Sequence, residues 1–443
     1  MKEAVPRETE TIAARRAFRL AEKIRNAKNE LRDRRSLWSG RPLEVGLVLL
    51  LFLLNLYVVY PLLNVTAVDQ PFSGPVIPLL IKILNFFRIS DTLAFQLVNF
   101  YFYLLFPLSL YFFVKEITKR KLTSFLAVLI ASLPFYPMAL GRVLSSFNGI
   151  DAAHIASLSV LPIALFSNYL FIKHGGVSNL ISAAVTSALI ALIAPFGFLT
   201  FIIFTSILTF SEMLLGNGRL KMIRFLAVLV FAGGLNSFWY NPGFFIWMIF
   251  GPMGSEVRAT ILKLLPLSFF TIPALGAFGY LLFDRKPNLQ PLFLASFFTL
   301  TFFLISIVGG GFFPSHPARY IPELGISLAF FISVMIIGLT DNLRLHFPTK
   351  IPIKKIGLFI NAFLVVMIFG LFVITVKIGR EVVANERVLG VWDDIEKGEI
   401  WKARDQFTGP VAFLGYSITV LSVSGLSLLT IKEKRKAVRK EST

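Results

Sequence analysis

The chain has 443 residues and contains no cysteine. Disulfide bonds, thiolate metal sites and cysteine nucleophiles are therefore excluded. Only four histidines are present, which argues against a zinc centre, and the sequence predicts no metal site. Charged residues account for only 16% of the chain, whereas a soluble domain carries roughly 25%. The shortage of charge predicts that much of the protein's surface faces lipid.

Hydrophobic residues make up 56% of the chain, and 47 of them are phenylalanine. Several apolar runs are long enough to cross the roughly 30 Å hydrocarbon core of a membrane. We therefore predict an all-α integral membrane protein of about twelve transmembrane helices. The predicted spans are 43–63, 92–114, 122–140, 154–172, 179–194, 196–215, 222–240, 261–283, 289–308, 323–340, 356–376 and 410–431.

Two apolar stretches depart from a simple series of spans. The run that covers 179–215 is too long for one helix, and Pro195 is expected to end the first of two helices. We predict two short helices joined by a tight outer turn. Residues 75–87, PVIPLLIKILNFF, are apolar but too short to span a membrane. They predict an interfacial or re-entrant helix in the first outer loop.

Basic segments flank the membrane domain of residues 43–431. Within residues 1–42, apolar side chains recur at alternating spacings of four and three over 13–31, with Arg and Lys on the other faces. This pattern predicts an amphipathic helix. We expect it to lie on anionic lipid headgroups or to bind a cytoplasmic partner. Residues 432–443 form a second basic segment, a short tail.

The distribution of Lys and Arg predicts the orientation. If the N-terminus is cytoplasmic and the spans alternate, the inner segments carry 32 of the 44 Lys and Arg residues. Such an excess is typical of cytoplasmic loops. It accounts for the formal charge of +19 without a nucleic-acid partner. We therefore predict a multi-pass protein of the cell membrane with both termini in the cytoplasm.

The predicted spans contain almost no ionisable residue at mid-depth. Ion-coupled transporters usually keep a carboxylate, lysine or histidine near the bilayer centre, where ion and substrate are handed over. The pattern argues against a transporter driven by protons or sodium. It leaves open a passive transporter or a lipid flippase.

The polar residues of interest lie in the predicted outer loops. The first loop contains Asp69, which could also be only a turn residue. The second contains Arg142, Asp151 and His154. Their structural alternatives are a headgroup anchor for Arg142, a helix N-cap for Asp151 and a packing role for His154.

The fifth outer loop reads GGGFFPSHPARYIPELG and contains His316, Arg319, Tyr320 and Glu323. Three glycines allow the chain to turn back toward the membrane. An arginine near a helix N-terminus adds a guanidinium fork to free amide donors, which suits a phosphate. Arg319 and Glu323 are four residues apart, so on a helix they share one face and could instead form a structural pair.

Together these features resemble the GT-C superfamily of polytopic glycosyltransferases, which use polyprenyl-phosphate-linked sugars, and especially its archaeal members. The matching features are Asp69, the 75–87 segment, the helix pair at Pro195, the Phe238-Trp239-Tyr240-Asn241-Pro242 span end and the Arg319-Tyr320-Ile321-Pro322-Glu323 sequence. The resemblance covers roughly residues 43–345, and its motifs are short.

The resemblance implies a transferase that acts at the outer face on a polyprenyl-phosphate-linked sugar, among membrane lipids. It implies no certain cofactor and is compatible with a divalent cation. Asp69 would be the catalytic base, and Arg319, with Arg142 and His316, would hold the phosphate. Tyr320 and Glu323 would position it, while Asp151 and His154 would contact the sugar or the acceptor.

The sequence also departs from the family pattern. The first outer loop is short, and Gln70 and Ser73-Gly74 stand where many members have a second acid or a histidine. No large extracytoplasmic domain follows the spans. A non-catalytic membrane scaffold is therefore a further alternative, beside the transporter or flippase.

A cysteine introduced at Ser442 tests the predicted orientation, because the chain has no other thiol. We expect it to stay unlabelled by a membrane-impermeant thiol reagent in intact cells and to react after permeabilisation. Labelling in intact cells would show that the orientation is reversed.

Overall fold

Helices form all the regular structure of the described residues, which are 41–61, 74–148, 151–250, 287–308, 317–346, 353–385 and 409–441 of the computed structural model. The chain divides after Leu50 into two compact units. The described part of the first is the beginning of α2. The helices are α2 (Arg41–Val59), α3 (Val76–Phe86), α4 (Asp91–Thr118), α5 (Lys121–Ala131), α6 (Ala139–Val143), the π-helix η2 (Leu144–Asn148), α7 (Ala152–His174), α8 (Val177–Ile193), α9 (Pro195–Leu214), α10 (Gly218–Asn236), α11 (Pro242–Phe250), the 3-10 turn η3 (Pro287–Leu289), α13 (Gln290–Val308), the 3-10 turn η4 (Pro317–Tyr320), α14 (Ile321–His346), α15 (Ile353–Val373), the π-helix η5 (Ile374–Ile378), α16 (Gly379–Asn385) and α17 (Pro410–Glu441).

Seven helical segments in the described part of the chain are long and apolar enough to cross a membrane. They are Pro42–Val59, Asp91–Thr118, Ala152–His174, Pro195–Leu214, Ile321–Asp341, Gly357–Val382 and Pro410–Glu433. The all-helical architecture predicted from the sequence is confirmed, and the seven segments are candidate membrane spans, whereas the count of twelve spans stays a prediction. The short helix predicted at 75–87 is present as α3. The predicted 261–283 span and the basic 1–40 stretch lie outside the described residues.

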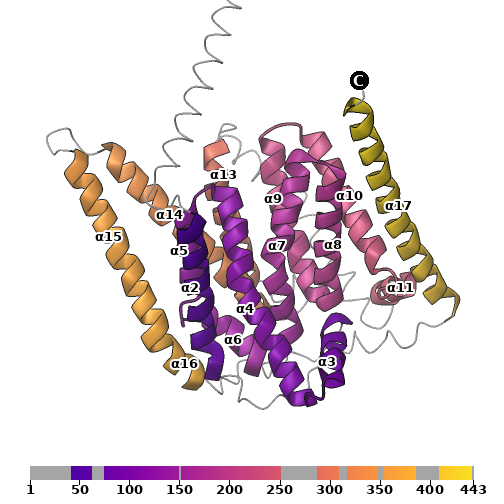
Figure 1. Ribbon diagram of the computed structural model, residues 1–443, viewed down its shortest axis with the longest axis horizontal. Helices are drawn as coiled ribbons and strands as arrows, with labels where there is room; N and C mark the ends of the chain where they lie inside the picture. Colours follow the sequence, from indigo (N-terminus) through magenta and orange to yellow (C-terminus); the bar gives the residue numbers. More distant parts are fainter. Residues whose placement is uncertain are drawn as a thin grey trace, which may run out of the picture. The chain divides into compact units, whose positions relative to one another are not determined.

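Helix α7 lies at the centre of the unit that begins at Leu51, with α4 and α8 packed against it (Figure 1). In its most apolar 18-residue stretch, 83% of α7 is buried. Its Asn168 donates a hydrogen bond to Ser187 of α8 over 3.0 Å. Helix α9 also packs on α7, and it begins so close that a Cβ added at Gly197 would overlap Ser157. The glycine therefore sets how near the start of α9 lies to α7.

The predicted break at Pro195 is confirmed. Ala194 alone separates α8 from α9, and its backbone is extended, with φ −151° and ψ 121°. Pro195 takes the first helical position of α9, where its missing N–H costs no hydrogen bond. The two helices pack against each other after the break. Phe196 is thereby fixed, largely buried, at the turn of this hairpin, next to the start of α7.

The predicted 122–140 span differs from the structure. Helix α5 ends at Ala131, and Pro134 and Pro137 follow, which cannot donate the backbone hydrogen bonds of a continuing helix. The chain then re-enters the protein as α6 and η2, and all five residues of α6 are buried. Arg142, predicted to lie in an outer loop, is therefore inside the helical packing.

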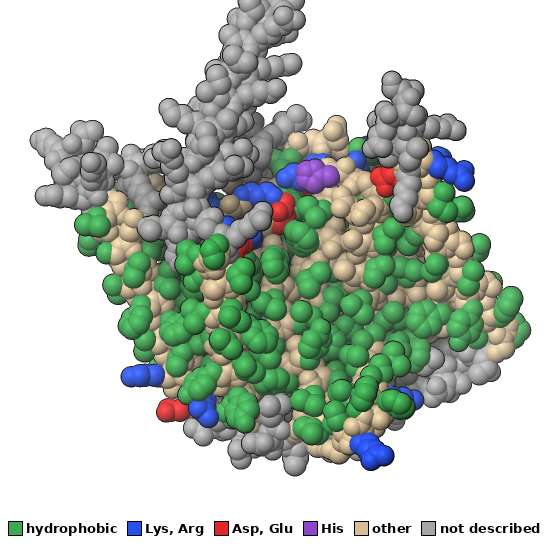
Figure 2. All heavy atoms as spheres, in the orientation of Figure 1, with side chains coloured by type: hydrophobic (Ala, Val, Ile, Leu, Met, Phe, Trp, Pro, Cys, Tyr) green, Lys and Arg blue, Asp and Glu red, His purple; other side chains and the backbone are tan. Residues whose placement is uncertain are grey.

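Helices α15 and α17 bury little of their surface. In the most apolar 18-residue stretch of each helix, only 17% of α15 and 11% of α17 is buried. Large side chains such as Phe359 and Phe413 are each 74% exposed. Apolar side chains dominate the side in view in Figure 2, with charged ones gathered toward its two ends. Such surfaces are expected of helices that face lipid.

A substitution at Gly325 tests how closely α14 packs on the turn at Pro137, two residues after Glu323. A Cβ there would overlap the carbonyl oxygen of Pro137, a backbone atom that cannot rotate away. We expect Gly325→Ala to lower the free energy of unfolding in detergent by about 1–3 kcal/mol. Gly338→Ala, in open space on the same helix, is the control. It should be neutral or slightly stabilising. Equal effects at both positions would contradict this packing.

Candidate functional site

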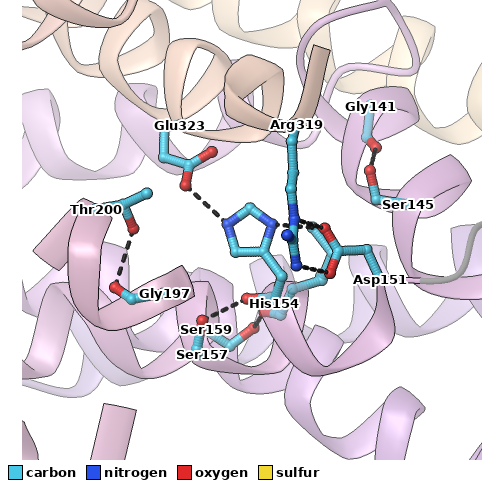
Figure 3. A network of polar contacts seen from close by, with 11 residues as sticks. Gly141, Ser145, Asp151, His154, Ser157, Ser159, Gly197, Thr200, Arg319 and Glu323 are labelled. Carbon is cyan, nitrogen blue, oxygen red and sulfur yellow. Dashed lines mark hydrogen bonds and ion pairs between the residues drawn. The ribbon is translucent and has the colours of Figure 1, made fainter. Parts of the chain in front are cut away.

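Four ionisable side chains meet where α7 and α14 begin (Figure 3). Asp151 directly precedes α7, and His154 lies in its first turn. Arg319 comes from η4, and Glu323 from the first turn of α14. Pairs within this group are separated by 168 and 169 residues along the chain. We call these four residues the acid–base cluster.

The strongest contact in the acid–base cluster joins Arg319 to Asp151. The Arg319 Nε donates to Oδ2 of Asp151 over 2.6 Å, and Nη2 donates to Oδ1 over 2.7 Å. This is the two-pronged geometry in which arginine binds a carboxylate or a phosphate. The Asp151 side chain is 8% exposed and the Arg319 side chain 17%. Arg319 is thus the most exposed member of the cluster.

His154 bridges the two carboxylates. Its Nδ1 lies 3.2 Å from Asp151 Oδ2, and its Nε2 lies 2.8 Å from Glu323 Oε1. An imidazolium can donate from both nitrogens, whereas a neutral imidazole donates from only one. The charged form therefore fits both contacts, and it balances two carboxylates with two cations. Glu323 is fully buried, and its Oε2 has no hydrogen-bond partner among the described residues.

The charge of Asp151 is stabilised by its neighbours. Burial by itself would raise its pKa, but the Arg319 guanidinium and His154 outweigh that effect and hold the pKa well below its usual range. A carboxylate of this kind contributes stability above its unfolded pKa of about 3.9, and the contribution is lost as the pH falls toward the lowered value. Asp151 is therefore ionised at neutral pH.

An aromatic ring that the sequence did not single out supports the cluster. The Arg319 guanidinium lies over the ring of Phe196, 4.0 Å from its centroid. His154 meets the same ring edge-on at 4.7 Å, and Tyr320 lies 4.9 Å away. The cluster is thus packed against the α8–α9 break. The position of Phe196 directly after Pro195 was the one signal that could have drawn attention to it.

The structure differs, in whole or in part, from two structural alternatives raised for these residues. Arg319 does not pair with Glu323, because the chain forms a 3-10 turn through Tyr320 and begins α14 only at Ile321. The two side chains therefore bind different partners on α7. Asp151 occupies the N-cap position of α7 as expected, but its side chain makes no capping hydrogen bond. Its carboxylate binds Arg319 instead.

Arg142 lies apart from the acid–base cluster. It is 2% exposed, so its interpretation as a headgroup anchor is wrong. Its Nη2 donates to the carbonyl of Ala131, the last residue of α5, over 2.9 Å. The guanidinium lies 3.8 Å from the ring centroid of Phe106 and 4.9 Å from that of Tyr103. A cation is favourable at the negative end of a helix dipole, so Arg142 holds the end of α5.

The remaining site residues predicted from the sequence are Asp69 and His316, and both lie outside the described residues. The roles that the resemblance implies for Asp69 and His316 stay predictions. Within the described part of the chain, no three His, Asp or Glu side chains are arranged to hold a metal ion.

No protein-family model, curated protein or solved structure matches this chain.

A double-mutant cycle measures the ion pair. We expect Asp151→Asn and Arg319→Gln each to lower the free energy of unfolding in detergent by about 2–4 kcal/mol, because each disrupts a largely buried pair of charge-assisted hydrogen bonds. The double variant should cost less than the sum, with a coupling above about 1 kcal/mol.

The matched control is the exposed pair of Arg120 and Asp341, whose side chains are 52% and 37% exposed. The same substitutions there should show a coupling below about 0.5 kcal/mol. Similar coupling in both cycles would mean that burial does not strengthen the Asp151–Arg319 pair.

Proposed function

We propose that this chain is a multi-pass membrane transferase, similar to the GT-C glycosyltransferases, that takes a sugar from a polyprenyl-phosphate donor at the outer face of the cell membrane. The observation that carries the proposal is the placement of Arg319. Its partly exposed guanidinium stands at the edge of a buried acid–base cluster, at the start of two helices. A lipid phosphate that lies at the membrane boundary needs a cation in such a place.

The chemistry of Arg319 suits the phosphate that leaves with the lipid. Transfer of the sugar to an acceptor hydroxyl develops charge on the leaving phosphate, and a fixed cation stabilises that charge. A guanidinium can bind two phosphate oxygens at once and remains charged at all relevant pH values. Phe196 holds the plane of this guanidinium. Asp151 binds the guanidinium through both of its oxygens, and His154 contacts Asp151.

The roles of Asp69 and His316 follow the family resemblance. Asp69 would take the proton of the acceptor hydroxyl, and His316 would add a donor to the phosphate. Tyr320 and Glu323 would keep the 3-10 turn and the first turn of α14 in place. Arg142 would serve the fold by holding the end of α5, rather than binding the donor, since its described contacts are with α4 and α5.

The proposal requires the acid–base cluster to lie on the outer side. Twelve spans with a cytoplasmic N-terminus would place the starts of α7 and α14 there. Positive residues of the joins α4–α5 and α9–α10, such as Lys119, Arg120 and Arg219, would then be cytoplasmic. The basic 1–42 and 432–443 segments would lie on the same inner side, where the first could bind anionic lipid or a protein partner.

Arg319→Lys tests the phosphate role. Lysine keeps the charge and loses the fork. We expect the affinity for a polyprenyl phosphate to fall roughly ten- to hundredfold, since each charge-assisted hydrogen bond contributes about 1.5–3 kcal/mol. The measurement is binding to the full chain in detergent micelles, with a melting curve for each variant.

Arg380→Lys is the control. Arg380 also stacks on an aromatic ring, that of Tyr57 at 4.7 Å, but it is exposed on α16. Its substitution should leave polyprenyl phosphate binding unchanged. If Arg319→Lys binds the lipid as tightly as the unaltered protein does, the phosphate role is refuted and a structural ion pair remains.

A further inference from the structure

The fork of Arg319 is already occupied by the protein itself. Both oxygens of Asp151 accept from it, at 2.6 and 2.7 Å. A carboxylate and a phosphate present two oxygens to a guanidinium in the same planar arrangement. An incoming phosphate therefore meets a guanidinium whose best donors are engaged, and it competes with Asp151 for them.

We propose that Asp151 is an internal competitor that the phosphate group of a polyprenyl-phosphate lipid displaces from Arg319, so that the guanidinium switches partner when the lipid phosphate binds. This inference rests on the proposed function. It assigns Asp151 a role opposite to that of a residue that merely positions Arg319.

Exposure supports an exchange at Arg319. Its side chain is 17% exposed, while those of Asp151, His154 and Glu323 are 8%, 1% and 0% exposed. An anion that arrives from outside therefore reaches Arg319 before any other member of the cluster. The carboxylates behind it are shielded from solvent.

Asp151 keeps a second partner, His154, when Arg319 leaves it. Its Oδ2 lies 3.2 Å from Nδ1 of His154. Once Arg319 turns to a phosphate, this imidazole can still donate to the carboxylate. His154 is itself held by Glu323 at 2.8 Å. The exchange therefore leaves Asp151 with one cationic partner and does not strand a buried charge, which would be costly.

Phe196 allows the guanidinium to change partners in place. The ring lies under one face of the guanidinium, 4.0 Å from its carbon atom. Hydrogen bonds to a guanidinium form in its plane and at its edges. The stacking contact therefore persists while the bonded edge changes, and the cation need not leave its site.

The test is binding of a polyprenyl monophosphate to the full chain in detergent micelles. Asp151→Asn removes the competing charge, and we expect about tenfold tighter binding, since the displaced charge-assisted bond no longer opposes the ligand. Asp151→Ser is the second variant, because serine keeps an N-cap oxygen for α7 but has no carboxylate. Melting curves identify which of the two variants is folded.

Two control variants distinguish competition by Asp151 from a general effect of the protein's net charge on phosphate binding. Asp341→Asn makes the same change at an acid that pairs with Arg120, and it should not alter binding. Glu323→Gln removes a negative charge from the same cluster but no bond to Arg319, so any gain should be several-fold smaller. An equal gain for Asp151→Asn and Glu323→Gln would show that net charge, not competition, sets the affinity.

Binding of other ligands to the same variants defines which group is recognised. Inorganic phosphate should show the same gain at lower affinity if the phosphate group alone is recognised. A polyprenol without phosphate should show no gain. An anionic phospholipid that gained equally would show that the site takes any lipid phosphate, and the polyprenyl assignment would fall.

The outcomes for the two proposals differ. If Arg319→Lys weakens binding and both folded Asp151 variants weaken it as well, Arg319 binds phosphate and the competitor role is wrong. If neither Arg319 nor Asp151 affects binding, the proposed function itself fails.

Discussion

A buried charge that is not paired strongly destabilises a membrane protein. At the starts of α7 and α14, each carboxylate of the acid–base cluster is paired with a cation. Asp151 and Glu323 are nearly inaccessible to solvent, and Arg319 and His154 face them across the helix junction. The contacts tie together residues that are far apart in the chain. The position of α14 relative to α7, and with it the place of Arg319, depends on them.

The rest of the packing serves this junction. Small residues bring backbones close where the cluster needs support: Gly197 lets α9 approach α7, and Gly325 lets α14 approach the turn at Pro137. Phe196 then reaches both cations from the start of α9. Arg142 secures the end of α5 in a separate interaction. The two guanidiniums thus have different surroundings: the partly exposed Arg319 faces a carboxylate, and the buried Arg142 faces a helix end and two rings.

The sequence allowed the helical membrane class, the short α3 and the break at Pro195 to be predicted, because apolar length and proline act locally. It also singled out all four members of the acid–base cluster, since ionisable residues are rare beside apolar runs. It could not pair them, because partners 168 residues apart are a product of tertiary packing. Arg319 lies in a short 3-10 turn that precedes the helix of Glu323, and only its place after Pro195 distinguished Phe196 among 47 phenylalanines. The twelve-span topology and the place of Asp69 remain predictions.

The single residue between α8 and α9 has a consequence for how this protein can change over evolution. Successive helical residues are rotated by about 100° around the axis. With only Ala194 between the helices, an inserted or deleted residue at this point has no loop to absorb it. It would turn the face of α9 that carries Phe196 away from Arg319 and move Gly197 off Ser157. Substitutions at the turn should therefore be tolerated far more readily than changes in its length, and a constant spacing from the end of α8 to Phe196 should mark any relative that keeps the acid–base cluster.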